Sequence, residues 1–180
     1  MFSTSSFIAI ATTLASALAQ TNITLSATFE DGSTSALAPL HEGAGFSFLF
    51  EYDSATNLQI DYELGIISIP SSVSEDSTFL LQADVDSKEI APFEFNIVSG
   101  HNSSVFWFLD RPTGGESRLN GVVKGEGSLI KFYAGKNATY DPYRYSTDRF
   151  FIGGSPYDID YLTVGGVTDL QEVEIWAKIA

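Results

Sequence analysis

The stretch "HEGAGFSFLFEY", residues 41–52, indicates the fold class of this chain. Its aromatic residues alternate with other side chains, so they fall on one face of an extended backbone: Phe46, Phe48, Phe50 and Tyr52. Gly43 and Gly45 oppose a helix and favour a tight turn that leads into the strand. His41 and Glu42 are then local turn residues that bond to nearby groups. The stretch therefore predicts a structural turn followed by a β-strand.

The same alternation recurs along the chain after residue 19. "ITLSATF" (23–29) and the last segment (173–179) each place apolar residues on one face and polar residues between them. Other runs have the length and the aromatic or β-branched content of strands: "LQIDYE", "GIISI", "TFLLQADV", "PFEFNIV", "VFWFLD", "SLIKFYAG", "RFFIGG" and "IDYLTV". Turn-forming clusters separate them: "EDGSTS", "SGHNSS", "RPTGGES", "LNG" and "GGVTD". The pattern predicts one all-β domain over residues 20–180, an antiparallel β-sandwich or jelly-roll-like barrel of about ten to twelve short strands.

Residues 1–19 have the features of a signal peptide. They carry no charged side chain and contain the apolar run "FIAIATTLASALA", which is short for a membrane span of roughly 20 residues. The run ends in Ala17-Leu18-Ala19, the small-x-small pattern that precedes a cleavage site. We therefore expect cleavage before Gln20, export of the chain and no membrane anchor, with an uncleaved anchor as the alternative.

The composition narrows the function classes. The chain has no cysteine, so disulfides, cysteine nucleophiles and thiolate metal sites are excluded and the fold must rest on packing. It carries 9 Lys and Arg against 23 Asp and Glu, a formal net charge of −14. Nucleic-acid recognition begins with a basic patch, so we expect no nucleic-acid partner. The charge suits a solvated extracellular surface.

Three asparagines lie in acceptor sites for N-glycosylation. These Asn-x-Ser/Thr sequences begin at Asn22, Asn102 and Asn137. Together with an export signal, they predict a glycoprotein of a eukaryotic secretory route. We expect all three asparagines on exposed turns.

The catalytic motifs in the chain are incomplete. His41-Glu42 starts a zinc-protease motif, but that motif needs a second histidine at position 45, which is glycine here. Gly43-Ala44-Gly45 starts a dinucleotide-binding motif, but Phe48 stands where the third glycine belongs. His101 lies in "SGHNSS" beside a glycan acceptor and is expected in a solvated loop. The sequence therefore predicts a non-enzymatic protein without a cofactor.

Two groups of carboxylates are weaker candidates. Asp158 and Asp160 in "YDIDY" would lie on one face of a strand, roughly 6.6 Å apart at the backbone, which is within the range of glycosidase carboxylate pairs. The same pair, or "DVDSKE" with Asp84, Asp86 and Glu89, could instead supply oxygen ligands to Ca²⁺, although neither stretch matches the twelve-residue calcium loop. Solvated turn positions are the competing interpretation.

Two aromatic stretches could stack on sugar rings. In "VFWFLD" (105–110), Trp107 points to the opposite face of the strand from Phe106 and Phe108. That face meets solvent, a covering loop or a groove, unless the strand is a core strand buried on both faces. In "YDPYRY" (140–145), a turn starting at Asp141-Pro142 groups three tyrosines into a surface patch: Tyr140, Tyr143 and Tyr145. Trp107 and these tyrosines are therefore candidates for binding carbohydrate.

Two of these stretches also carry a family resemblance. "HEGAGFSFLF" (41–50) and "KFYAGKNATYDPYRYS" (131–146) resemble the small cell-wall mannoproteins of ascomycete yeasts, the group that contains the yeast-form wall protein. The resemblance implies a glycosylated, non-enzymatic wall or secreted protein that influences surface adhesion. Family members commonly continue into a Ser/Thr-rich stalk and a glycolipid-anchor signal. The chain ends at Ala180 without either, so loose wall association or release is the expectation.

Taken together, the residues and the resemblance predict a secreted, N-glycosylated protein of the fungal cell wall with a structural or adhesion-modulating role. Its partners would be wall polysaccharide or other wall components. The alternative is a carbohydrate-binding module or lectin for wall polysaccharide, with or without the assistance of calcium.

Overall fold

The computed structural model describes residues 20–43, 46–70, 77–99, 103–111, 115–137 and 149–180, and this part of the chain is built from antiparallel β-strands without an α-helix. The strands are β1 (Gln20–Thr28), β2 (Thr34–Gly43), β3 (Phe46–Tyr52), β4 (Leu58–Asp61), β5 (Ile66–Ile69), β6 (Ser77–Gln82), β7 (Glu94–Ser99), β8 (Val105–Leu109), β9 (Glu116–Val123), β10 (Lys131–Lys136), β11 (Phe151–Ser155), β12 (Thr168–Glu172) and β13 (Glu174–Ile179). The predicted all-β class is confirmed, and the described residues form thirteen strands where about ten to twelve were expected.

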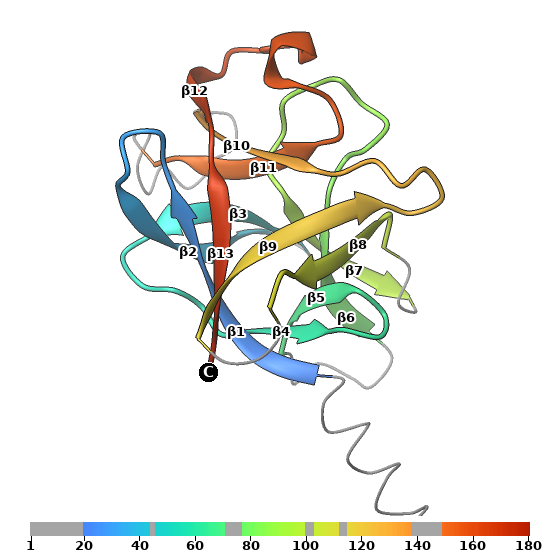
Figure 1. The fold of residues 1–180 in the computed structure, drawn as a ribbon. Coiled ribbons are helices and arrows are strands. Elements are labelled where there is room, and N and C mark those ends of the chain that lie inside the picture. The colour runs from blue at the N-terminus through green and yellow to red at the C-terminus, as the bar shows by residue number, and fades with distance from the viewer. Residues whose placement is uncertain (1–19, 44–45, 71–76, 100–102, 112–114, 138–148) are drawn as a thin grey trace, which may run out of the picture.

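Seven of the strands close into a barrel in the order β1, β2, β3, β7, β6, β5, β4. The ring closes at β1, which pairs with β4 along Gln20–Ile23 and with β2 along Ser26–Thr28. On the other edge of β1, residues 23–28 pair with β13, and β13 pairs with β9. Figure 1 shows β13, in red, running beside the blue β1 and the yellow β9. A second extension, β11, β10 and β12, continues from β3.

One hydrophobic core joins the ring and the extensions. It contains buried side chains from every described strand except β12, and Trp107, Phe93 and Phe95 are among its largest fully buried members. The indole of Trp107 meets the Phe93 ring edge-on at 5.5 Å between centroids. Because the chain has no cysteine, this shared apolar burial supplies the main stabilising term.

Strand β3 is buried on both faces. Leu49 belongs to the main core, whereas Phe50 belongs to a second apolar cluster together with Ile90, Tyr133 and Phe151. Phe48 and Phe50, on the aromatic face that defines this strand in the sequence, therefore pack against residues of β10 and β11, whereas Tyr52 at the end of the strand is exposed.

The turn stretch 41–45 joins β2 to β3. The backbone of His41 to Gly43 ends β2, with a register irregularity between His41 and Gly43, and Gly43 pairs with Phe46 at the start of β3. Ala44 and Gly45 lie outside the described residues. The structure thus places the described part of this stretch in a β-hairpin.

Two local predictions are wrong. "IDYLTV" was expected to be a strand, but Ile159–Tyr161 forms a 3-10 helix, η2, with Asp158 as its N-cap. "LNG" (119–121) was expected to be a turn, but it lies within β9, where Gly121 pairs with Trp107 across the β8–β9 ladder. A Cβ at position 121 would stand 2.7 Å from the indole, so glycine is needed here for close packing rather than for a turn.

In the described part of the chain, no helix has the length and apolar content of a membrane span.

Candidate functional site

The outer face of β1, β2, β9 and β13 carries an aromatic side chain among polar ones. In β13, Ile175 and Ala177 are buried in the core, and the residues that alternate with them point outward: Glu174, Trp176 and Lys178. Trp176 is half-buried, so part of its indole is open to solvent. This strand therefore contributes one face to folding and presents the other to the surroundings.

Strand pairing fixes the neighbours of Trp176. Its partner in β1 is Ser26, whose own partner in β2 is Ala36, and its partner in β9 is Arg118. On either side of this row, Glu174 pairs with Thr28, and Lys178 pairs with both Thr24 and Glu116. These are backbone registers of a continuous ladder, so the side chains are held by the sheet rather than by loops. We call this outer face the Trp176 surface.

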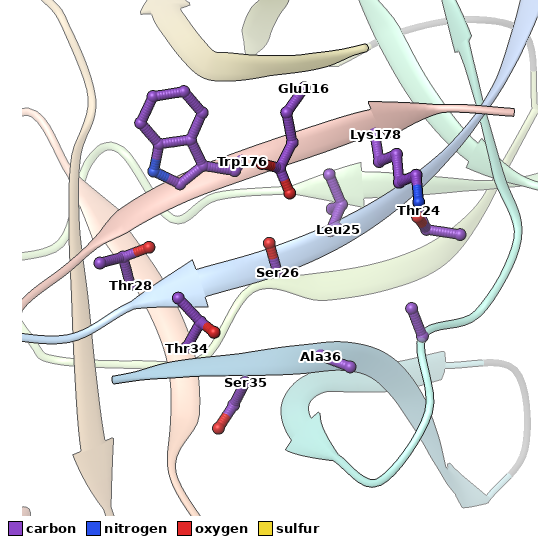
Figure 2. A pocket seen from close by; sticks show the side chains of 11 residues that line it. Thr24, Leu25, Ser26, Thr28, Thr34, Ser35, Ala36, Glu116, Trp176 and Lys178 are labelled. Carbon is purple, nitrogen blue, oxygen red and sulfur yellow. The ribbon is translucent and has the colours of Figure 1, made fainter. Parts of the chain in front are cut away.

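A groove lies on the β1 and β2 side of Trp176. It has a volume of about 410 Å³, and five of its eleven lining residues have short, hydroxylated side chains: Thr24, Ser26, Thr28, Thr34 and Ser35. Figure 2 shows the indole of Trp176 on one side of the β13 ribbon and the side chains of Ser26, Thr28 and Thr34 on the other. Each hydroxyl both donates and accepts hydrogen bonds, so the groove offers many polar contacts next to one flat apolar ring.

A second groove lies on the β9 side of the same indole. Its volume is about 470 Å³, and it shares Trp176 and Glu116 with the first groove. Its floor includes Ser117, whose Oγ accepts a hydrogen bond from the backbone N–H of Arg111 at 2.8 Å. Both volumes fall within the range of roughly 300–1,000 Å³ that small-molecule sites occupy. Trp176 is thus the shared wall of two adjacent grooves.

The charges around Trp176 cancel. Three acidic and three basic side chains line the two grooves: Asp110, Glu116, Glu174, Arg111, Arg118 and Lys178. Arg118 and Glu174 form an ion pair with 3.2 Å between Nη2 and Oε1, and both side chains remain about half exposed. The formal charge here is zero in a chain whose net charge is −14, because three of its nine basic residues gather at this surface.

Trp107 does not belong to this surface or to any other. Its side chain is fully buried, and its Nε1 donates a hydrogen bond to the carbonyl of Leu81 at 3.3 Å. It faces the core because the opposite residue, Gly121, has no side chain and leaves room for the indole. The half-buried residues of β8 are instead Phe106 and Phe108. The prediction that Trp107 binds carbohydrate is therefore wrong for this structure.

The other predicted binding and modification residues are only partly described. Tyr140, Tyr143, Tyr145 and Asn102 lie outside the described residues. Asn22 is exposed, but it lies in β1 rather than on a turn, and its Oδ1 accepts a hydrogen bond from Gln59. Asn137 follows β10, is half-buried, and donates from Nδ2 to the carbonyl of Gly165 at 3.4 Å. An attached glycan at Asn22 would lie two residues from Thr24 on the same outer face.

The carboxylate candidates do not gather into a site. Asp158 forms an ion pair with Lys131, and Asp160 lies in η2, so the two residues do not share a strand face. Asp84 Oδ1 accepts hydrogen bonds from the backbone N–H groups of Asp86 and Ser87, which makes it a turn-forming residue. Across the residues that the structure describes, no three His, Cys, Asp or Glu side chains lie close enough together to hold a metal ion.

The sequence does contain a signal for Trp176. In "EVEIWAKIA", the apolar residues at 173, 175, 177 and 179 alternate with polar ones, and Trp176 falls in the polar set with Glu174 and Lys178. A tryptophan in the polar half of an alternating strand is an exposed aromatic by pattern alone. The neighbours that make it a site come from β1, β2 and β9, and these pairings are not visible in the sequence.

No protein-family model, curated protein or solved structure matches this chain. The resemblance to yeast wall mannoproteins therefore stays a prediction, and the function of the Trp176 surface is inferred from its own residues.

Proposed function

We propose that the protein is a secreted, N-glycosylated protein of the cell wall that binds carbohydrate through the Trp176 surface. The observation that carries this proposal is a half-buried tryptophan held on a rigid sheet between two polar grooves. An indole offers a flat, electron-rich face on which the C–H groups of a sugar ring can pack. The surrounding hydroxyl, carboxylate and guanidinium groups match the donors and acceptors of sugar hydroxyls.

Rigid strands favour such a role. Residues 23–28 of β1 pair with β13 on one edge, and residues 26–28 of the same segment pair with β2 on the other. Side chains on this ladder lose little further freedom when a ligand binds, and this preorganisation reduces the entropic cost of binding. We therefore propose Trp176, in place of the predicted Trp107, as the tryptophan that binds sugar.

Tryptophan fluorescence tests the proposal. The chain has two tryptophans, and only Trp176 is partly exposed. In a Trp107→Phe variant, the emission comes from Trp176 alone, and we expect wall polysaccharide fragments to change it saturably. An unchanged spectrum over the whole concentration range, with a natively folded variant, would contradict carbohydrate binding at this surface.

A second candidate function is a structural or adhesion-modulating coat without a specific ligand. It is favoured by the net charge of −14 and by the exposure of the acceptor residue Asn22. Acidic side chains and hydrated glycans repel similar surfaces and hold water. Enzymatic removal of N-glycans should then increase the electrophoretic mobility of the secreted protein. An unchanged mobility would contradict N-glycosylation in both candidate functions and would leave carbohydrate binding at the Trp176 surface to be decided by the fluorescence test.

A further inference from the structure

We infer that the Trp176 surface binds the interior of an extended, uncharged chain of β-linked glucose or N-acetylglucosamine units. This inference rests on the proposed carbohydrate-binding function and names the class of ligand. Three observations carry it: the position of the indole between two grooves, the partial exposure of its flat ring, and the charge balance around it.

The position of Trp176 favours a chain over a single terminal sugar. One groove leads from the indole across β1 to β2, and the other leads across β9 toward Asp110 and Arg111. A sugar ring stacked on the indole would therefore have room for neighbouring units on both sides. A terminal sugar would leave one of these grooves empty, with its polar side chains unused.

The flat shape of the ring selects among sugars. The indole of Trp176 lines both grooves and is only half-buried, so part of the ring is open to a ligand. In β-linked glucose and N-acetylglucosamine, every ring substituent is equatorial, and both ring faces present C–H groups that pack on an aromatic face. An α-linked mannose unit carries axial oxygens at C1 and C2, one on each face, and these oxygens oppose such packing.

The charge balance disfavours acidic polysaccharides. The three acidic and three basic side chains of the grooves sum to zero, and Arg118 is already paired with Glu174. The surface therefore offers no net positive charge to a polymer with one carboxylate per unit, and the rest of a protein of net charge −14 repels such a polymer. Neutral chains meet no such penalty.

Calorimetric titration of the purified protein with soluble oligosaccharides tests the inference. The probes are laminaribiose to laminarihexaose, cellohexaose, chitohexaose, α-mannohexaose and oligogalacturonate. We expect binding of at least one glucose or N-acetylglucosamine series, affinity that rises with chain length, and no binding of galacturonate. Trp176→Ala should weaken this binding about tenfold or more, because stacking on an aromatic ring contributes that much. Trp176→Phe should retain part of it.

The control is Tyr161→Ala, which removes an exposed aromatic side chain from η2, outside both grooves, and should leave the affinity unchanged. Preferred binding of mannose or galacturonate chains that depends on Trp176 would overturn the inferred ligand class and keep the proposed function. Affinity that is already maximal with a disaccharide would overturn the inference that the ligand is an extended chain. No binding of any probe, or binding that Trp176→Ala leaves intact in a folded variant, would overturn both.

Discussion

Gly121 shows how one missing side chain fixes the position of a large one. A Cβ at this residue would stand 2.7 Å from Cζ3 of Trp107 and 2.9 Å from Cγ1 of Val105, closer than a methyl group can approach. All three residues are buried, so neither neighbour has free space into which to move.

Gly121→Ala should therefore lower the free energy of unfolding by about 1–3 kcal/mol, the usual cost of overpacking. The measurement is urea unfolding followed by circular dichroism. The matched control is Gly165→Ala, where a Cβ would meet no atom within 4 Å and the backbone is not left-handed. Equal stability of the two variants would contradict the packing role of Gly121.

Asp31 illustrates a turn residue whose titration reports its local hydrogen bonds. The side chain and the backbone N–H of Ser33 bond to its carboxylate and lower the pKa of Asp31 below its usual value of 3.8. Because the folded pKa lies below the unfolded one, this contribution to stability is present above the usual pKa and is lost as the pH falls through the folded pKa.

Ser33→Ala should raise the pKa of Asp31 toward its usual value, since the side-chain hydrogen bond is the largest cause of the shift. The backbone hydrogen bond at 2.8 Å remains and should keep part of the shift. Titration of the carboxyl carbon by NMR measures the change. An identical pKa in both proteins would show that the Ser33 hydroxyl does not bond to Asp31.

At the scale of the element, β13 has two faces with different roles. Ile175 is buried in the core, and its neighbour Trp176 is half-buried on the outer face. Ile175→Ala should lower the free energy of unfolding by about 2–5 kcal/mol, because it leaves a cavity in a packed core.

Trp176→Ala should cost about 1 kcal/mol or less, as surface substitutions usually do. Denaturant unfolding of the two variants gives both values. A Trp176→Ala protein as destabilised as Ile175→Ala would mean that the tryptophan is a core residue and would remove the reason to place a ligand on it.

The strands also show which elements can be predicted from local alternation in the sequence and which cannot. Alternation is a local signal, and it correctly indicates β1, β3 and β13 because each has one strongly apolar face. It fails for β9, in which Asn120-Gly121 has the composition of a turn, since the packing of Trp107 on Gly121 overrides the local preference. It also fails at Asp158 and Asp160, where a short 3-10 helix replaces the expected strand.

The candidate site was less predictable than the fold. Trp176 can be placed on the outer face of its strand from local alternation. Its neighbours Ser26 and Arg118 lie far from it in the sequence, and only strand pairing brings them beside it. The inward orientation of Trp107 likewise depends on its partner across the ladder. Sites that are assembled by long-range pairing leave no spacing motif in the chain.

In the whole molecule, the Trp176 surface differs from the rest of the protein in its net charge. The chain has a net charge of −14, and the charged side chains that line the two grooves sum to zero. Binding of an uncharged polysaccharide at this surface should therefore change little, less than about twofold, between low salt and about 0.5 M salt. Titrations at several salt concentrations give the dependence. A steep loss of affinity with salt would indicate an electrostatic partner instead.

We propose that the half-buried Trp176 on the outer face of the sheet binds wall carbohydrate. The most direct test is a sedimentation assay of the purified protein on insoluble β-glucan, chitin and mannan, with wild type and Trp176→Ala side by side. We expect saturable binding of the wild type to β-glucan or chitin, and loss of that binding in the variant with its melting temperature nearly unchanged. Wild-type protein that stays in the supernatant with all three polymers would contradict it.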